Sequence, residues 1–268
     1  MISFPNSKIN LGLNIISKRP DGYHNLESCI YPIQWEDMLE IMPADKTQFT
    51  CSGGIVPGSE HDNLCLKAYR MLQQEYDLPP VQMHLHKIIP IGAGLGGGSA
   101  DASYTLLILN DIFQLKIQRS ILEEMASIIG SDCPFFISNK PVYATGTGTT
   151  LSEINIDLSG MHIVVVKPDA SISTADAYSG IIPKVQKEGI REIIESVHFT
   201  EWKYYLNNDF EDGIFQKYPE IKLIKEQLYE LGATYASMSG SGSAVYGLFK
   251  DKPDVLRFRR YQHFTGLL

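Results

Sequence analysis

The chain has 268 residues, of which 44% are apolar and 20% charged, as in ordinary soluble globular proteins. This length allows one large domain or two medium ones, and the net charge of −8 argues against nucleic acid or an anionic membrane as partner. No apolar run is long enough to cross a bilayer, and we expect no secretion signal, because residues 1–10 hold no basic segment followed by an apolar one. Four cysteines lack Cys-x-x-Cys spacing, so we expect a cytoplasmic protein with reduced thiols, most of them buried.

The first predicted element is a strand over residues 7–16, in which apolar and polar side chains alternate. Ile9 and Leu11 point to one face, and Lys8 and Asn10 point to the other. Small amide side chains and one lysine suit a lined site better than open solvent.

The next elements lie within the first 80 residues. They are a turn at 19–22, strands at 27–33 and 37–42, and a helix from Asp62 or Asn63 to about Glu75.

A glycine-rich stretch at residues 90–102 follows a predicted strand at 81–89 and precedes a predicted helix at 99–110. Glycine lets a ligand approach the main chain, and a helix N-terminus attracts anions, so the pattern predicts a phosphate-binding loop. His84 and His86 share one face of the preceding strand. Because no third ligand lies nearby, we expect surface histidines and no metal site.

Beyond the glycine stretch, Ser120 and Glu123 form a capping-box pattern for a helix that ends at Gly130. Asp132 then precedes an apolar, strand-like run, where helix capping or a turn is the more common role for an aspartate. A short strand at 142–144 and a polar loop at 145–150 follow, and we place a domain boundary near residue 155.

The second half is predicted to alternate strands and helices. The expected elements are a strand at 162–166, a helical start that carries Tyr178, helices near 185–196, 201–206 and 220–231, a hairpin at 233–249 with a Gly/Ser loop at 238–243, and a short helix after Pro253.

Three common classes of protein with a glycine-rich phosphate-binding loop are excluded. A Walker loop needs Gly-Lys-Ser/Thr, whereas Ser99 and Ala100 follow these glycines. A dinucleotide fold needs a further strand ending in an acid about 20 residues on, and none follows. The His-Arg-Asp and Asp-Phe-Gly motifs of protein kinases do not occur.

The combination of motifs resembles the GHMP superfamily of small-molecule kinases over essentially the full length. The motifs that carry the resemblance are Ser-Lys-Ile-Asn-Leu at 7–11, Arg-Pro-Asp-Gly-Tyr-His at 19–24, Asp-Asn-Leu at 62–64, the glycine stretch, Gly-Ser-Asp-Cys-Pro-Phe-Phe at 130–136, and Ser-Gly-Ser-Gly-Ser at 239–243.

This resemblance implies an α+β fold of two domains. Residues 1–155 would form an ATP-binding domain similar to domain 2 of ribosomal protein S5, and residues 156–268 a ferredoxin-like domain, with the active site in a cleft between them. It also implies phosphoryl transfer from ATP, accompanied by Mg2+, to the 2-hydroxyl of a cytidyl-methylerythritol substrate in the non-mevalonate isoprenoid pathway, with no obligate protein partner.

The site residues follow from the same resemblance. Asp132 would accept or orient the hydroxyl proton, and Lys8 would keep Asp132 ionised and stabilise the transferred charge. The substrate-binding residues would be Asn10, Tyr23, His24, Thr174 and Tyr178. The ATP-binding residues would be Asn63, Lys87, Pro90, Ile91, Gly92, Ala93, Gly94, Leu95, Gly96, Gly97, Gly98, Ser99, Ala100 and Asp101, with Ser99 and Asp101 nearest to the metal.

Two other functions stay open at this point. One is a superfamily kinase acting on mevalonate or homoserine, which has no use for Tyr23, His24 and Tyr178. The other is a nucleotide-binding protein without catalysis, against which the presence of both Lys8 and Asp132 speaks. Two departures from the family pattern are Thr145, where many relatives carry a charged residue, and a short C-terminus that we expect to lack a final strand.

Overall fold

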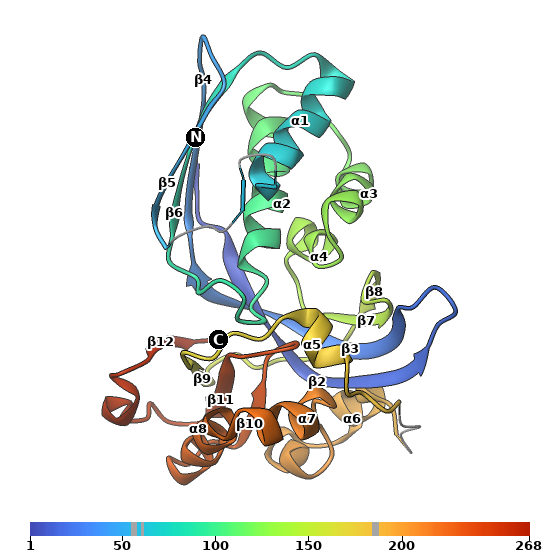
Figure 1. The fold of residues 1–268 in the computed structure, drawn as a ribbon, viewed down its shortest axis with the longest axis vertical. Helices are drawn as coiled ribbons and strands as arrows, with labels where there is room; N and C mark the ends of the chain where they lie inside the picture. Colours follow the sequence, from blue (N-terminus) through green and yellow to red (C-terminus); the bar gives the residue numbers. More distant parts are fainter. Residues whose placement is uncertain (55–57, 60–61, 184–187) are drawn as a thin grey trace. The chain divides into compact units, whose positions relative to one another are not determined.

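The computed structural model describes residues 1–54, 58–59, 62–183 and 188–268 (Figure 1). Its contacts divide the chain into two compact units. Unit 1 contains residues 1–7, 35–91 and 96–140, and unit 2 contains residues 8–34, 92–95 and 141–268. Residues 8–34 and 141–155 therefore group with the C-terminal half, whereas the single boundary expected near residue 155 stays a prediction.

Unit 1 is a four-stranded sheet with helices on one face (Figure 1). The strand order is β1 (Ile2–Ser3), β4 (Met38–Pro43), β6 (Val81–Lys87) and β5 (Gln48–Gly53). The helices are α1 (Leu64–Tyr76), α2 (Gly97–Ile112), α3 (Arg119–Ile129) and α4 (Cys133–Ser138).

Alternation along β6 explains this packing. Val81, Met83 and Leu85 are buried in one core with Leu106 and Leu109 of α2, as the period of two in the strand predicts. The side chain of Asn63 caps α1 by accepting from the amide of Leu66 at 3.1 Å, which confirms the predicted helix start.

Unit 2 contains two four-stranded sheets. One has the order β2 (Asn6–Lys18), β3 (His24–Glu36), β7 (Val142–Gly146) and β8 (Thr150–Glu153), and the other β10 (Tyr235–Met238), β11 (Val245–Phe249), β9 (His162–Lys167) and β12 (Gln262–Leu267). The helical segments are α5 (Thr174–Tyr178), α6 (Ile190–Ser196), η1 (Phe199–Tyr204), α7 (Phe210–Lys217), α8 (Pro219–Glu230) and η2 (Leu256–Phe258).

Two local predictions in unit 1 were wrong. The capping box at Ser120 does not form, because α3 begins at Arg119 and the carboxylate of Glu123 accepts from the hydroxyl of Ser138 instead. The apolar run after Asp132 is the helix α4 rather than a strand. Pro134 stands in its first turn, where a missing amide hydrogen costs nothing.

Three predictions in unit 2 need correction. The chain does have a final strand, since β12 pairs antiparallel with β9 along its whole length. Helix α7 was missed, although Asn208 and Asp209 before Phe210 form a recognisable helix-start pattern. The segments expected near 201–206 and after Pro253 are the short 3-10 helices η1 and η2. The start of the helix expected at Val185 lies outside the described residues.

Candidate active site

Lys8 and Asn10 lie side by side on β2 and are almost fully buried, at 4% and 5% exposure. The ammonium of Lys8 donates to Asn10 Oδ1 at 2.5 Å, and Asn10 Nδ2 donates to the hydroxyl of Ser28 at 2.8 Å. The main-chain carbonyl of Asn10 accepts from the hydroxyl of Tyr246 at 2.7 Å. The polar face of this strand is therefore a buried hydrogen-bonded network rather than a solvated surface.

Residues 92–95 of the glycine stretch pack between this strand and the Gly/Ser loop at 239–243. The amide of Lys8 donates to the carbonyl of Leu95 at 2.9 Å, and the amide of Ala244 donates to that of Ala93 at 3.1 Å. The hydroxyl of Ser239 donates to the carbonyl of Gly94 at 2.8 Å. The Gly/Ser loop thus holds residues 93 and 94 of the glycine stretch in place by hydrogen bonds, in addition to reversing the chain between β10 and β11.

Gly94 has no room for a side chain. Its φ is +75°, and a Cβ there would lie 2.0 Å from the carbonyl oxygen of Ser239. Only glycine satisfies both the conformation and the close approach of the two loops.

Helix α2 begins at Gly97, two residues earlier than predicted, with Gly96 as its N-cap at φ 72°. The first turn of the helix has no acidic side chain and no side-chain cap. Amides at such an end are available to an anion and carry the positive end of the helix dipole. The phosphate-binding role predicted for residues 90–101 stays a prediction, with which this uncapped start of α2 is compatible.

Lys87 and Asp101 form a buried ion cluster with a residue that the sequence did not single out, Asp37. The ammonium of Lys87 contacts a carboxylate oxygen of Asp37, and it lies 2.8 Å from Asp101 Oδ2. Asp37 also accepts from the amides of Ile88 and Ile89 at 2.5 and 2.8 Å.

The charges of this cluster change the acidity of its members. Burial raises the pKa of Asp101 to about 7, although Lys87 opposes the shift and Asp37 adds to it. Burial alone lowers the pKa of Lys87, but the two carboxylates outweigh it and the net pKa is raised. Both predicted ligand contacts, of Lys87 with nucleotide and of Asp101 near the metal, stay predictions, while the observed role of the two side chains is to join β6 to α2.

Asp132 occupies the N-cap position of α4, but its carboxylate accepts no cap hydrogen bond from the first amides of this helix, so helix capping does not explain it. The next residue is firmly held, because the hydroxyl of Ser103 on α2 donates to the carbonyl of Cys133 at 2.7 Å. The half-buried Asp132 is thereby tied to the helix that follows the glycine stretch. Lys8 belongs to unit 2 and Asp132 to unit 1, and their expected pairing stays a prediction.

The predicted substrate residues of unit 2 come together in part. His24 stacks on Tyr178 with 4.9 Å between ring centroids, and the ring of Phe210 meets Tyr178 edge-on at 4.8 Å. Tyr23, which precedes His24 in the sequence, is 67% exposed, and Thr174 is an exposed residue in the first turn of α5. The turn at 19–22 that precedes Tyr23 is present as predicted, closed by Gly22 at φ +86°.

The two histidines of β6 are half-buried members of a hydrogen-bond chain rather than free surface residues. The hydroxyl of Ser52 bonds both His84 and His86 at 2.9 Å, and Thr50 bonds the other nitrogen of His84 at 2.8 Å. Within the described parts of the chain, no group of three His, Cys, Asp or Glu side chains could hold a metal ion.

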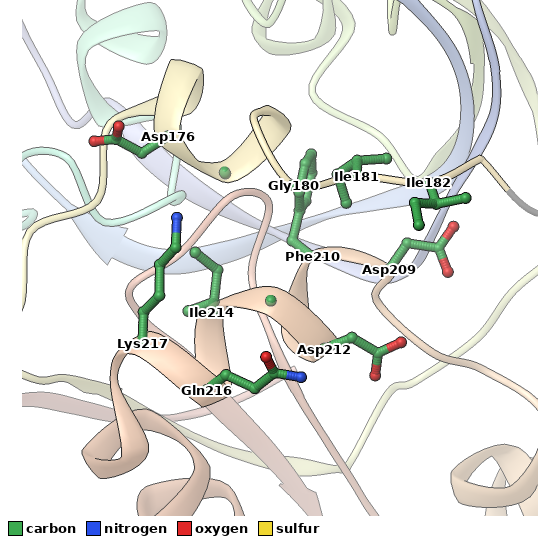
Figure 2. Close-up of a pocket in the computed structure, with 12 residues that line it drawn as sticks. Asp176, Gly180, Ile181, Ile182, Asp209, Phe210, Asp212, Ile214, Gln216 and Lys217 are labelled. Atoms are coloured by element: carbon green, nitrogen blue, oxygen red, sulfur yellow. The ribbon is translucent and has the colours of Figure 1, made fainter.

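One further cavity, of about 220 Å3, lies between α5 and α7 in unit 2 (Figure 2). Figure 2 shows Ile214 and Lys217 pointing from α7 toward α5, with Phe210 at the side. None of the predicted substrate residues lines it, but Phe210 connects it to the ring of Tyr178.

Several residues of these networks were not predicted from the sequence. Ser28, Asp37, Asn208 and Tyr246 are ordinary polar residues whose importance depends on partners 18 to 236 residues away. Only Asn208 carried a local signal, its place just before a helix.

Comparison with known proteins defines the class. Residues 63–140 match the model of the GHMP kinases N terminal domain, and residues 182–261 match that of the GHMP kinases C terminal domain. The 4-diphosphocytidyl-2-C-methyl-D-erythritol kinase of Cytophaga hutchinsonii is 52% identical over 256 residues, covering 95% of this chain and 94% of its own.

Solved structures agree with this class. A crystal structure of 4-(cytidine 5'-diphospho)-2C-methyl-D-erythritol kinase matches 99% of this chain and 98% of its own, with a TM-score of 0.82 and 28% identity. The homoserine kinase of Cytophaga hutchinsonii, at 14% identity and a TM-score of 0.64, covers 92% of this chain and 86% of its own and shares the fold alone. The chain is a GHMP kinase, and it belongs within that class to the 4-diphosphocytidyl-2-C-methyl-D-erythritol kinase family.

Membership confirms the predicted fold class and the predicted kinase activity, and it implies the use of ATP. In the parts of the chain that the structure covers, no helix is both long and apolar enough to span a bilayer.

Proposed function

We propose that this enzyme transfers the γ-phosphoryl group of ATP to the 2-hydroxyl of 4-diphosphocytidyl-2-C-methyl-D-erythritol, in the non-mevalonate route to isoprenoid precursors. The observation that carries the proposal is the 52% identity, over 95% of the chain, to a kinase named for this substrate. The stacked His24 and Tyr178 of unit 2 support it, because a base-bearing substrate has use for an aromatic platform and mevalonate or homoserine has none.

In the proposed reaction, the bond between the γ-phosphorus and the oxygen of ADP breaks while a bond to the 2-oxygen forms. Asp132 has one of two roles: as a base it takes the hydroxyl proton while the new bond forms, and as an orienting group it accepts the hydrogen bond of the hydroxyl and directs the 2-oxygen at the γ-phosphorus. Lys8 stabilises the charge on the transferred group. Phosphoryl transfer depends mainly on such positioning and charge neutralisation.

The ATP phosphates are proposed to lie against residues 90–101, because α2 starts there without a side-chain cap and the first amides of a helix suit an anion. Asn63 and Lys87 complete the proposed nucleotide contacts. Asn10, Tyr23, His24, Thr174 and Tyr178 are proposed to hold the cytidyl substrate. The described residues do not fit a dedicated protein site for Mg2+, since Asp101 is enclosed with Lys87 and no triad of ligands exists among them. We therefore assign no catalytic step to the metal.

The test is an ATP-consumption assay with the cytidyl substrate, mevalonate and homoserine in parallel. We expect turnover of the cytidyl substrate alone, and a fall of about 10²–10⁴-fold in Asp132→Asn. Asp157→Asn, which changes an exposed aspartate, is the matched control. Turnover of mevalonate or homoserine instead would overturn the substrate, and unchanged rates in Asp132→Asn would remove Asp132 from the reaction.

Lys8 is tested by the same assay combined with binding of CDP. Lys8→Ala should lose turnover by orders of magnitude and keep its affinity for CDP, because Lys8 is assigned to the transferred group rather than to the base. A loss of CDP affinity that equals the loss of turnover would contradict this assignment.

A further inference from the structure

We propose that Asn208 is a positioning residue, which holds the Gly/Ser loop at 239–243 against the ammonium of Lys8. The inference rests on the proposed role of Lys8 in phosphoryl transfer. It is carried by hydrogen bonds within unit 2 from the side chain of Asn208 to the main chain at Met238 and Gly240.

The side chain of Asn208 uses one amide hydrogen on this loop and the other on Met238, the last residue of β10 before the loop. Its Nδ2 donates to the carbonyls of Met238 and Gly240, both at 2.8 Å, while its Oδ1 accepts from the amide of Phe210 at 3.0 Å. With 2% exposure, Asn208 has no water with which to replace these partners.

The main chain around Asn208 is anchored to the strand that carries Lys8. Leu13 of β2 donates its amide to the carbonyl of Asn207 at 2.8 Å and accepts from the amide of Asp209 at 2.9 Å. The carboxylate of Asp209 accepts from the amide of Ile15, also on β2, at 2.7 Å. Asn208 is therefore a fixed link between β2 and the loop.

Gly240 is the residue at which the loop lies close to Lys8, the proposed catalytic lysine. A Cβ at Gly240 would lie 3.3 Å from the ammonium nitrogen of Lys8, 3.3 Å from the carbonyl oxygen of Gly94 and 3.4 Å from Asn10 Oδ1. Gly240 also has φ +55°, which disfavours any side chain. Because Gly240 is already closely packed against Lys8, Gly94 and Asn10, the loop has no room to shift toward Lys8. The hydrogen bond from Asn208 to the carbonyl of Gly240 therefore determines how closely the loop approaches Lys8.

The discriminating variant is Asn208→Asp. It keeps the shape and an oxygen that can accept from the amide of Phe210, so the start of α7 and the contact of Phe210 with Tyr178 are retained. It removes both N–H donors and turns an oxygen toward two carbonyls, which repel it. The loop should move away from Asn208.

We expect kcat to fall by about tenfold to a hundredfold, as for an ångström-scale misplacement, while affinity for CDP stays within about threefold. Amide hydrogen exchange of a peptide covering 239–244 should accelerate by at least about tenfold. The matched control is Asn110→Asp in unit 1, where the amide of Asn110 likewise bonds the main chain of a loop, at Ile117. Its kcat and its exchange over 239–244 should stay near those of the wild type.

The exchange measurement separates this inference from the proposed function, because it needs no substrate. Unchanged exchange over 239–244 in Asn208→Asp overturns the inference even if the wild type is active, as does unchanged kcat. If the wild type does not use the cytidyl substrate, the proposed function fails while exchange still decides whether Asn208 holds the loop. Should Asn208→Asp not fold, Gly240→Ala tests the same contact. It should lose kcat and keep CDP affinity, and an unchanged kcat would overturn the inference.

Discussion

The imidazole of His24, at the start of β3, stacks on the phenol ring of Tyr178, at the end of α5, with 4.9 Å between centroids and 23° between ring planes. The two rings are 154 residues apart in the sequence and leave no layer for a base between them. A cytosine that stacks on Tyr178 must therefore displace His24 or bind beside it. His24 is then well placed to contact the edge of the base.

Replacing Tyr178 by alanine should weaken the binding of CDP. Stacking of a base on an aromatic side chain is worth about 1–3 kcal/mol, which corresponds to roughly a fivefold to hundredfold loss of affinity. Isothermal titration calorimetry with CDP measures it. Tyr204→Ala, which removes a ring that is 71% exposed on η1, should bind CDP like the wild type. Equal affinities of Tyr178→Ala and the wild type would exclude Tyr178 from the base site.

Two glycines of the glycine stretch should respond oppositely to alanine. Gly94→Ala places a Cβ 2.0 Å from the carbonyl oxygen of Ser239 at positive φ, so we expect a loss of about 3 kcal/mol or more and a melting temperature lower by roughly 6–12 °C. Gly98→Ala, inside α2, meets only Leu64 at 3.7 Å and should gain about 0.5–1 kcal/mol from the lower entropy of the unfolded chain. Thermal unfolding of both variants decides it, and a Gly94→Ala protein as stable as Gly98→Ala would contradict the close loop contact.

The buried Asp101 predicts a slope of stability against pH. Because burial raises its pKa from 3.8 to about 7, the native protein keeps a proton between these values that the unfolded chain has released. The contribution of Asp101 to stability is therefore highest below pH 4, falls as the pH rises toward 7, and levels off above it.

Asp101→Asn lacks this titration, so the stability of the wild type relative to this variant should decline between about pH 4 and pH 7. Urea unfolding at a series of pH values measures the difference. Asp45→Asn, at an exposed position of the same unit, should run parallel to the wild type. A constant difference between wild type and Asp101→Asn would show that the cluster takes up no proton on folding. The groups that face Asp101 in the cluster are Lys87 and Asp37.

One of the four cysteines should react readily in the native protein. Cys51 is exposed, whereas Cys29, Cys65 and Cys133 are buried. Burial raises the pKa of all four thiols, that of Cys133 to about 11 and that of Cys29 and Cys65 further, but only Cys51 is also accessible to a reagent. Dithiobis-nitrobenzoate should label one thiol quickly in native protein and four in denaturant. Cys51→Ser should abolish the fast phase, and its persistence would place the reactive thiol elsewhere.

Short-range patterns in the sequence predicted much of the secondary structure. The alternation over residues 7–16 predicted β2, and Asn63 predicted the start of α1, because both signals act within a few residues. The run after Asp132 was misread, since a short apolar segment of six residues has no periodicity that separates a buried strand from a buried helix. Strand β12 escaped for a similar reason. It is an edge strand with Gly266 in its interior, so its own residues carry only a weak strand pattern. The strand forms because it pairs with β9.

The sequence by itself determined that a glycine stretch stands before a helix, that Lys8 and Asn10 share one face of a strand, and that the chain resembles GHMP kinases. Only the tertiary structure decided why particular residues are needed. Gly94 must be glycine because of Ser239, which lies 145 residues further along the chain. Lys87, at the end of the strand that precedes the glycine stretch, is enclosed by Asp37 and Asp101. The reason is physical: backbone propensities and periodicity act over a few residues, whereas close approach and charge pairing depend on strands and loops that folding alone brings together.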